Sequence, residues 1–137
     1  MIYCNSCKQL QDGAHQQIIY DLPYVLIIIL NRGKNNQDFN EDFEYPEILD
    51  FNNSGISINP NTPYKKFYLC GIIKHLGESG SSGHFIAYCR NSFANKFMCY
   101  NDSVVYEASF IDAMTTNVSY NENERKTPYI LFYHFYE

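Results

Sequence analysis

His84 and the polar residues that follow a nearby aromatic run are the part of this sequence best suited to chemistry. His84 lies between a stretch of glycine and serine and an apolar run that is typical of a strand. A histidine can take a proton from a nucleophile when a second group holds one ring nitrogen and leaves the other nitrogen free. A catalytic role for His84 therefore requires a partner that holds its ring.

The sequence offers such a partner across a predicted hairpin. Two strand candidates, HFIAYC and FMCYND, are joined by a polar connection of ordinary hairpin length. The simplest register sets Tyr88 opposite Phe97 and His84 opposite Asn101, which brings facing side chains within contact distance. A slip of one residue would present Asp102 instead. Spacing alone leaves both Asn101 and Asp102 open as the partner.

The segment Ser79–Gly83 (SGSSG) precedes His84 and has little side-chain bulk. Because glycine allows many backbone conformations, such a loop lets a substrate chain approach closely and can move on binding. The same features also suit an ordinary solvent-exposed loop followed by a surface histidine. On chemistry alone, both interpretations stay open.

The elements around these residues read mainly as strands. The chain has 13 Tyr and 10 Phe, many within β-branched or apolar runs. The run YVLIIIL, residues 24–30, predicts a central strand buried on both faces. Further strands are expected at residues 15–21, 64–75, 84–89, 97–102 and 128–135, with a loop at LGESGSSG and a short helix at 109–115 that points Phe110, Ala113 and Met114 inward. The expected fold class is α+β, predominantly antiparallel sheet with little helix.

Composition excludes two classes of partner. The net charge is −5 and the basic residues form no run longer than two, which argues against nucleic acid. The longest apolar run is far shorter than the roughly 20 residues of a membrane-spanning helix, so no membrane partner is expected. The first residues lack the pattern of a secretory signal, and the five cysteines are odd in number. We therefore expect reduced thiols and a cytoplasmic or nuclear location.

Cys4 and Cys7 have the spacing of a zinc knuckle, in which a short loop lets two thiolates reach one metal. Two ligands make half of a tetrahedral site. The sequence therefore predicts a structural zinc half-site or, equally well, two free thiols. A minimal zinc-binding interaction domain is a further interpretation that rests on this pair alone.

Several blocks in order along the chain resemble the carboxy-terminal half of the ubiquitin-specific proteases, the ubiquitin carboxyl-terminal hydrolases of papain-like fold. The blocks are YCNSCK, DLPYVLIIILNRGK, YPEILDF, YLCGIIKHLGESGSSGHFIAYCRN, FMCYNDSVV and TPYILFYHF. The resemblance runs from Tyr3 to about Phe135. It implies that residues 1–137 form part of such a catalytic domain, the palm and fingers half.

The resemblance also implies roles for individual residues. Family members are cysteine proteases that cleave the bond after the terminal glycine of ubiquitin, and they need no cofactor for catalysis. His84 matches the general base, Asn101 the residue that orients it, and Asp102 an adjacent acidic position. The residues that match the substrate channel and its blocking loop are Ser79, Gly80, Ser81, Ser82, Gly83 and Phe85. The expected partners are ubiquitin or ubiquitinated proteins.

The family's nucleophilic cysteine lies in an amino-terminal box that we do not find in these 137 residues. Cys70, Cys89 and Cys99 lie in predicted strands and are expected to be small core residues with poor access to substrate. We therefore expect the chain alone to be inactive and to work with an amino-terminal half supplied elsewhere. The alternative is an inactive ubiquitin-binding or scaffolding module derived from such an enzyme.

Overall fold

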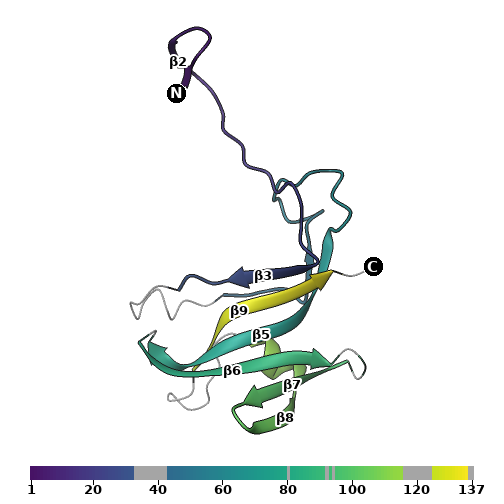
Figure 1. Ribbon diagram of the computed structural model, residues 1–137. Coiled ribbons are helices and arrows are strands. Elements are labelled where there is room, and N and C mark those ends of the chain that lie inside the picture. Colours follow the sequence, from purple (N-terminus) through teal and green to yellow (C-terminus); the bar gives the residue numbers. More distant parts are fainter. Residues whose placement is uncertain (33–42, 80, 92, 94, 116–124, 136–137) are drawn as a thin grey trace.

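A seven-stranded antiparallel sheet forms most of the chain. The computed structural model describes residues 1–32, 43–79, 81–91, 93, 95–115 and 125–135. The strand order is β3-β9-β5-β6-β7-β8, and β4 pairs with β5 outside this path (Figure 1). The bounds are β3 Val25–Ile29, β4 Ile48–Asp50, β5 Lys66–Ser79, β6 Ser82–Asn91, β7 Lys96–Asn101, β8 Val104–Ala108 and β9 Lys126–Phe135. The expected α+β fold, mainly antiparallel with little helix, is confirmed.

The amino-terminal hairpin stands away from this sheet. Strands β1 (Ile2–Cys4) and β2 (Gln9–Gln11) pair with each other, and an extended segment joins them to the rest of the molecule (Figure 1). The strand predicted at residues 15–21 is wrong, because Ile19 makes only an isolated parallel bridge to Ile58. Its backbone bonds go to the loop at residues 57–59 rather than to a strand.

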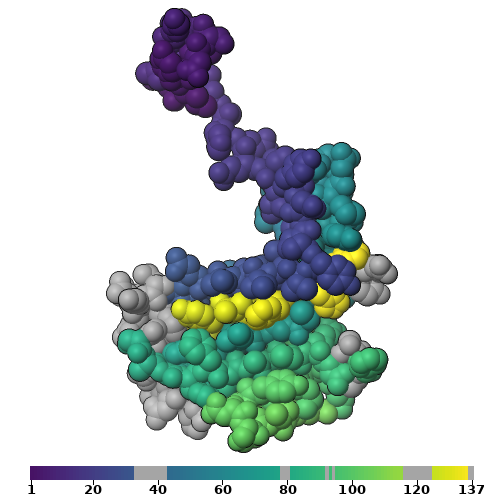
Figure 2. Space-filling view, in the orientation of Figure 1, coloured from purple at the N-terminus to yellow at the C-terminus, as the bar shows by residue number. Residues whose placement is uncertain are grey.

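The central position predicted for YVLIIIL is also wrong. Strand β3 pairs only with β9 in the described sheet and forms one of its edges. In the space-filling view β9 lies as a band between β3 and β5 (Figure 2). Val25, Ile27 and Ile29 alternate along β3 and are 43, 53 and 67% exposed. An unbroken apolar run fixes the hydrophobicity of both faces of a strand, but it does not say which element lies beside each face.

The core lies on the opposite face of the sheet. Its members include Phe67, Leu69, Ile72, Leu131 and Tyr133, all at most 1% exposed. Burying such side chains removes apolar surface from water, which is the main favourable term in folding. The core lies on β5 and β9 and continues over β6 and β7, where Tyr88 and Cys99 are fully buried.

A short helix, α2 (Phe110–Met114), covers part of the core face, as the sequence predicted. The Ser109 hydroxyl oxygen caps it by accepting from the Asp112 backbone N–H at 3.0 Å. Ala113 is fully buried, whereas Phe110 is 49% exposed, so the predicted inward position of Phe110 is wrong. The fully buried Lys74 of β5 donates from Nζ to the carbonyl oxygens of Asp112 and Thr115, at 2.7 and 2.8 Å. This lysine ties the end of the helix to the sheet.

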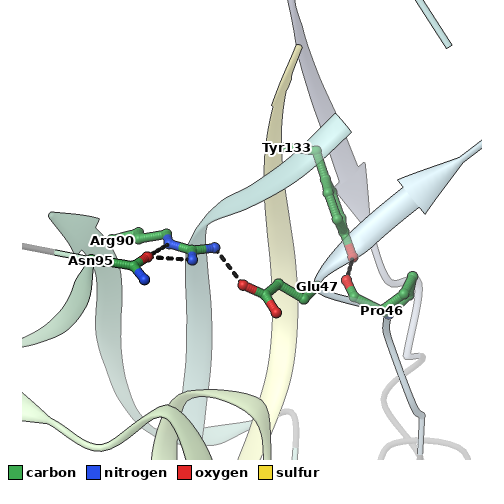
Figure 3. A network of polar contacts seen from close by, with 5 residues as sticks. All are labelled: Pro46, Glu47, Arg90, Asn95 and Tyr133. Atoms are coloured by element: carbon green, nitrogen blue, oxygen red, sulfur yellow. Dashed lines mark hydrogen bonds and ion pairs between the residues drawn. The ribbon is translucent and has the colours of Figure 1, made fainter. Parts of the chain in front are cut away.

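A polar network fixes the segment that leads into β4. The Arg90 guanidinium donates to the Glu47 carboxylate at 2.7 Å and also to the side-chain oxygen Oδ1 of Asn95. The Tyr133 hydroxyl donates to the Pro46 backbone carbonyl at 2.7 Å (Figure 3). Arg90 thus links the carboxyl end of β6 to the segment that leads into β4. His84 lies six residues earlier, about 20 Å away along the strand.

Candidate active site

The glycine- and serine-rich segment before His84 is a tight hairpin tip rather than the predicted loop. Strand β5 continues to Ser79, which pairs with Ser82 at the start of β6. Ser81 and Gly83 are exposed, whereas Gly80 lies outside the described residues. The β5–β6 register shifts between Leu76 and Ser79. Most residues of the expected loop therefore belong to the paired strands β5 and β6.

The hairpin of β6 and β7 has a different register from the predicted one. Tyr88 faces Cys99 rather than Phe97, a shift of two residues. Because side chains alternate with a period of two, this shift keeps His84 and Asn101 on the same face of the sheet. They are diagonal neighbours instead of direct partners, still within reach of long side chains.

His84 and Asn101 contact each other directly. The distance from His84 Nε2 to Asn101 Oδ1 is 2.7 Å, a short hydrogen bond. Since a carbonyl oxygen only accepts, Nε2 must carry the proton of the bond, and Nδ1 then holds the lone pair of the neutral ring. The His84 side chain is 41% exposed. The ring is therefore held at one nitrogen and able to accept a proton at the other.

Asp102 lies farther from the ring. Its Oδ2 is 3.7 Å from His84 Nε2, and its side chain is 79% exposed. Its φ is +52°, a value that Asp tolerates better than most residues, in the turn between β7 and β8. The structure brings both candidates to His84, with Asn101 as the hydrogen-bond partner and Asp102 as a longer-range ion-pair partner when His84 is charged.

Phe85 lies on the other face of β6 and is 52% exposed. Its ring packs edge-on against His75 and Tyr129, with centroid distances of 4.8 and 5.5 Å. Phe85 therefore belongs to an aromatic cluster beside the hairpin tip. The two glycines of this tip, Gly77 and Gly83, have φ of +147° and +150°, which other residues rarely adopt.

The cysteines of β5, β6 and β7 differ in burial. Cys99 is fully buried, as expected. Cys70 is partly buried, and burial raises the pKa of its thiol. Cys89 is exposed, so its predicted core position is wrong. It lies on the face of β6 that the core does not cover, a distinction that an apolar run cannot reveal.

Cys4 and Cys7 form the predicted knuckle. The Cys7 backbone N–H and side chain and the Ser6 backbone N–H bond to the Cys4 sulfur and lower the pKa of that thiol. Donors aimed at a sulfur stabilise the thiolate, the form that binds metals. Within the described residues, no group of three or more His, Cys, Asp or Glu side chains could hold a metal ion. In the described part of the chain, Cys4 and Cys7 therefore have no third such side chain beside them.

Two buried basic residues of β5 were not identified from the sequence. Lys74 and His75 are 0 and 4% exposed, although both fall in a strand that was read correctly. Burial lowers the pKa of Lys74 to about 7. The sequence signal for this burial was a pair of basic residues at the end of an apolar strand. Basic residues are seldom fully buried unless they are paired, so their position in such a strand indicates a specific partner.

Comparison with known proteins places the chain in a family. The sequence model of the family described as ubiquitin carboxyl-terminal hydrolase matches residues 1–133. Ubiquitin carboxyl-terminal hydrolase 9 of Saccharomyces cerevisiae is 30% identical over 96% of this chain, and ubiquitin carboxyl-terminal hydrolase 25 of Arabidopsis thaliana is 37% identical over 74%. The chain spans 17 and 15% of those two proteins.

Solved structures agree. A SAGA DUB module of Ubp8, Sgf11, Sus1 and Sgf73 bound to monoubiquitin contains a chain with a TM-score of 0.74 and 26% identity, which matches 99% of this chain and 28% of its own length. A second such module, bound to ubiquitin aldehyde, gives a TM-score of 0.73 at 25% identity. No helix among the described residues is long and apolar enough to cross a membrane. From its sequence and its sheet, this chain is a member of the ubiquitin carboxyl-terminal hydrolase family.

Proposed function

We propose that this chain supplies the general-base half of a deubiquitinating cysteine protease site. The observation that carries the proposal is the 2.7 Å contact from His84 Nε2 to Asn101 Oδ1, which holds one ring nitrogen and leaves Nδ1 as the acceptor. Asn101 orients the imidazole, and Asp102, 3.7 Å away, adds negative charge near a protonated His84. This arrangement is the one that a thiol nucleophile needs beside it.

The reaction that follows has two steps. His84 takes the proton of a cysteine thiol, the thiolate attacks the carbonyl carbon of the last glycine of ubiquitin, and His84 returns the proton to the departing amine. Water then hydrolyses the thioester, with His84 again as base. The hairpin tip precedes His84 in the chain and Phe85 follows it, and we assign to residues 79–83 and Phe85 the contact with the ubiquitin tail.

The nucleophile comes, in this proposal, from outside these 137 residues. Cys99 is fully buried, and Cys70 is partly buried with a raised pKa. Cys89 is exposed but lies on the face of β6 opposite to His84. Cys4 and Cys7 lie on the separate amino-terminal hairpin. An amino-terminal half of the catalytic domain, in the same or another chain, would supply the reactive thiol. The chain alone would then bind ubiquitin without hydrolysing it.

Two further assignments belong to the proposal. Cys4 and Cys7 would hold a structural zinc ion together with two ligands from beyond the described residues, because the donors on the Cys4 sulfur favour a thiolate. Such a metal would stiffen the hairpin and take no part in the reaction. All five cysteines are free thiols, which supports a reducing compartment, the cytoplasm or nucleus.

Hydrolysis of a ubiquitin–aminomethylcoumarin conjugate tests the catalytic role. The gene product is expressed with any coding sequence that adjoins these residues, and the His84→Ala variant is expected to lose roughly 1,000-fold or more in kcat. His15→Ala, which removes an exposed histidine, is the matched control and should retain activity. Full activity in His84→Ala would contradict the proposal. Binding of ubiquitin without turnover by the unaltered protein would instead identify an inactive ubiquitin-binding module.

A further inference from the structure

The backbone at His84 is held by strand pairing from one side only. The β6–β7 ladder begins at the pair Ala87 and Tyr100, three residues beyond His84. On the other side, Leu76 of β5 pairs with His84, and the register shifts directly after that pair. His84 is thus the last regularly paired residue before an irregular hairpin tip. A contact other than strand pairing is therefore needed to fix the backbone of the hairpin tip.

The ring of His75 occupies the space beside this tip. A β-carbon on Gly83 would overlap Cε1 and Nε2 of the His75 ring and the Leu76 carbonyl oxygen. A β-carbon on Gly77 would lie 3.0 Å from the same Cε1 atom. The imidazole therefore packs directly on the backbone of the residue before His84. Only glycine leaves room for it at Gly83.

The same ring also contacts the residue after His84. Phe85 meets His75 edge-on at a centroid distance of 4.8 Å and an interplanar angle of 67°. Tyr129 of β9 supports Phe85 from its other side at 5.5 Å. His75 thus contacts both chain neighbours of His84. The side chains of His75 and His84 themselves lie on opposite faces of the sheet.

The charge of His75 fits a supporting role. Burial and, to a smaller extent, the nearby charge of His84 lower the pKa of His75. A neutral imidazole at this place adds no positive charge beside His84 when His84 takes up a proton. The His75 residue is only 4% exposed, so its contacts are with the protein and not with a substrate.

We propose that His75 is a positioning residue for His84: its ring, wedged between the hairpin glycines and Phe85, fixes the backbone that points His84 at Asn101. This inference rests on the proposed function for its catalytic consequence, but the geometry it describes exists without turnover. Displacing a base by about 1 Å can lower a rate by roughly 100-fold, so a loose tip has a measurable cost.

Nuclear magnetic resonance of the isotope-labelled 137-residue chain tests the geometry. His75→Ala is expected to shift and broaden the imidazole signals of His84 and the side-chain amide signals of Asn101, and the smaller polar side chain of His75→Asn should do so less. The matched control is Ile73→Ala, a truncation two residues earlier on the same strand face. Equal spectra at His84 and Asn101 in His75→Ala and Ile73→Ala would overturn the proposal, because a purely structural role would act alike in both.

Ubiquitin–aminomethylcoumarin kinetics of the gene product tests the consequence. His75→Ala is expected to lower kcat by roughly 10- to 100-fold while KM stays within about twofold, and Ile73→Ala should change neither beyond about twofold. Equal kcat in the two variants would overturn the positioning role. If His84→Ala keeps its activity, the proposed function fails, and the spectra alone then decide whether His75 positions His84.

Discussion

The two hairpins that carry sulfur or imidazole chemistry in this chain are built in opposite ways. At the amino-terminal hairpin, Cys4 and Cys7 are brought together within four residues, and the Lys8 backbone N–H donates to the Cys4 carbonyl at 2.8 Å. At the other site, His84 and Asn101 are 17 residues apart and meet only because β6 pairs with β7. The Cys4 and Cys7 pair can form without the sheet. The contact of His84 with Asn101 instead depends on the register between β6 and β7.

Glycine-to-alanine substitutions in the two hairpins should differ most in their effect on the free energy of unfolding. Gly83→Ala places a methyl group against the His75 ring and the Leu76 carbonyl at a φ of +150°, so we expect a loss of about 3 kcal/mol or more in the free energy of unfolding. In Gly13→Ala the new methyl group meets only the flexible end of Ile2, at 3.0 Å, and the change should stay within about 0.5 kcal/mol. Urea denaturation measures both, and equal losses would contradict the difference.

Truncating the two partners of His84 should lower kcat more for the nearer partner. Asn101→Ala removes the 2.7 Å acceptor and should lower kcat for ubiquitin–aminomethylcoumarin roughly 100-fold. Asp102→Ala removes an exposed carboxylate 3.7 Å away and should cost less than about tenfold, since solvent screens such a pair. The reverse ranking would make Asp102 the orienting residue.

Lys74 should make the stability of the sheet depend on pH. Burial lowers the pKa of Lys74 from 10.5 to about 7, so the unfolded chain binds more protons between these values and stability rises with pH across that window. The gain is at most about 4 kcal/mol. The neutral amine keeps two N–H donors, which suffice for Asp112 and Thr115.

Urea denaturation at pH 7 and pH 9.5 checks this dependence. The Lys74→Met variant should show a smaller rise in the free energy of unfolding than the unaltered chain. Lys66→Met is the control, because Lys66 is a 56% exposed surface lysine and should leave the rise in place. An unchanged rise in Lys74→Met would mean that the buried amine does not titrate in this range.

The smallest effect is expected at the knuckle. Cys4→Ser should change the free energy of unfolding of the sheet by less than about 0.5 kcal/mol, because the hairpin stands apart from it (Figure 1). The same variant should bind less zinc than the unaltered protein, measured by metal analysis after dialysis. A loss of sheet stability comparable to that of Gly83→Ala would show that the two hairpins fold as one unit.

The strand content and the meeting of His84 with Asn101 could be predicted because both rest on short-range pattern. Because side chains alternate along a strand, the sequence predicts which residues share a face of the sheet. A register shift of two residues changes the direct pairs but leaves each side chain on the same face. The predicted pairing of Tyr88 was therefore wrong, whereas the predicted contact of His84 with Asn101 was right. The position of β3 at an edge and the outward turn of Cys89 could not be predicted. Apolar character at a position does not say what lies against it.

The sequence alone was enough to predict the family, the mainly antiparallel sheet, the Cys4 and Cys7 knuckle and the face that His84 shares with Asn101. These depend on residue type and on spacings that a single hairpin or knuckle contains. Spacing left both Asn101 and Asp102 open, and the fold shows that Asn101 bonds the His84 ring, as the family resemblance implied. That His75 packs under the hairpin glycines is visible only in the three-dimensional contacts. Those contacts depend on a β-bulge and on the exact register between strands, which are set by packing across the whole sheet.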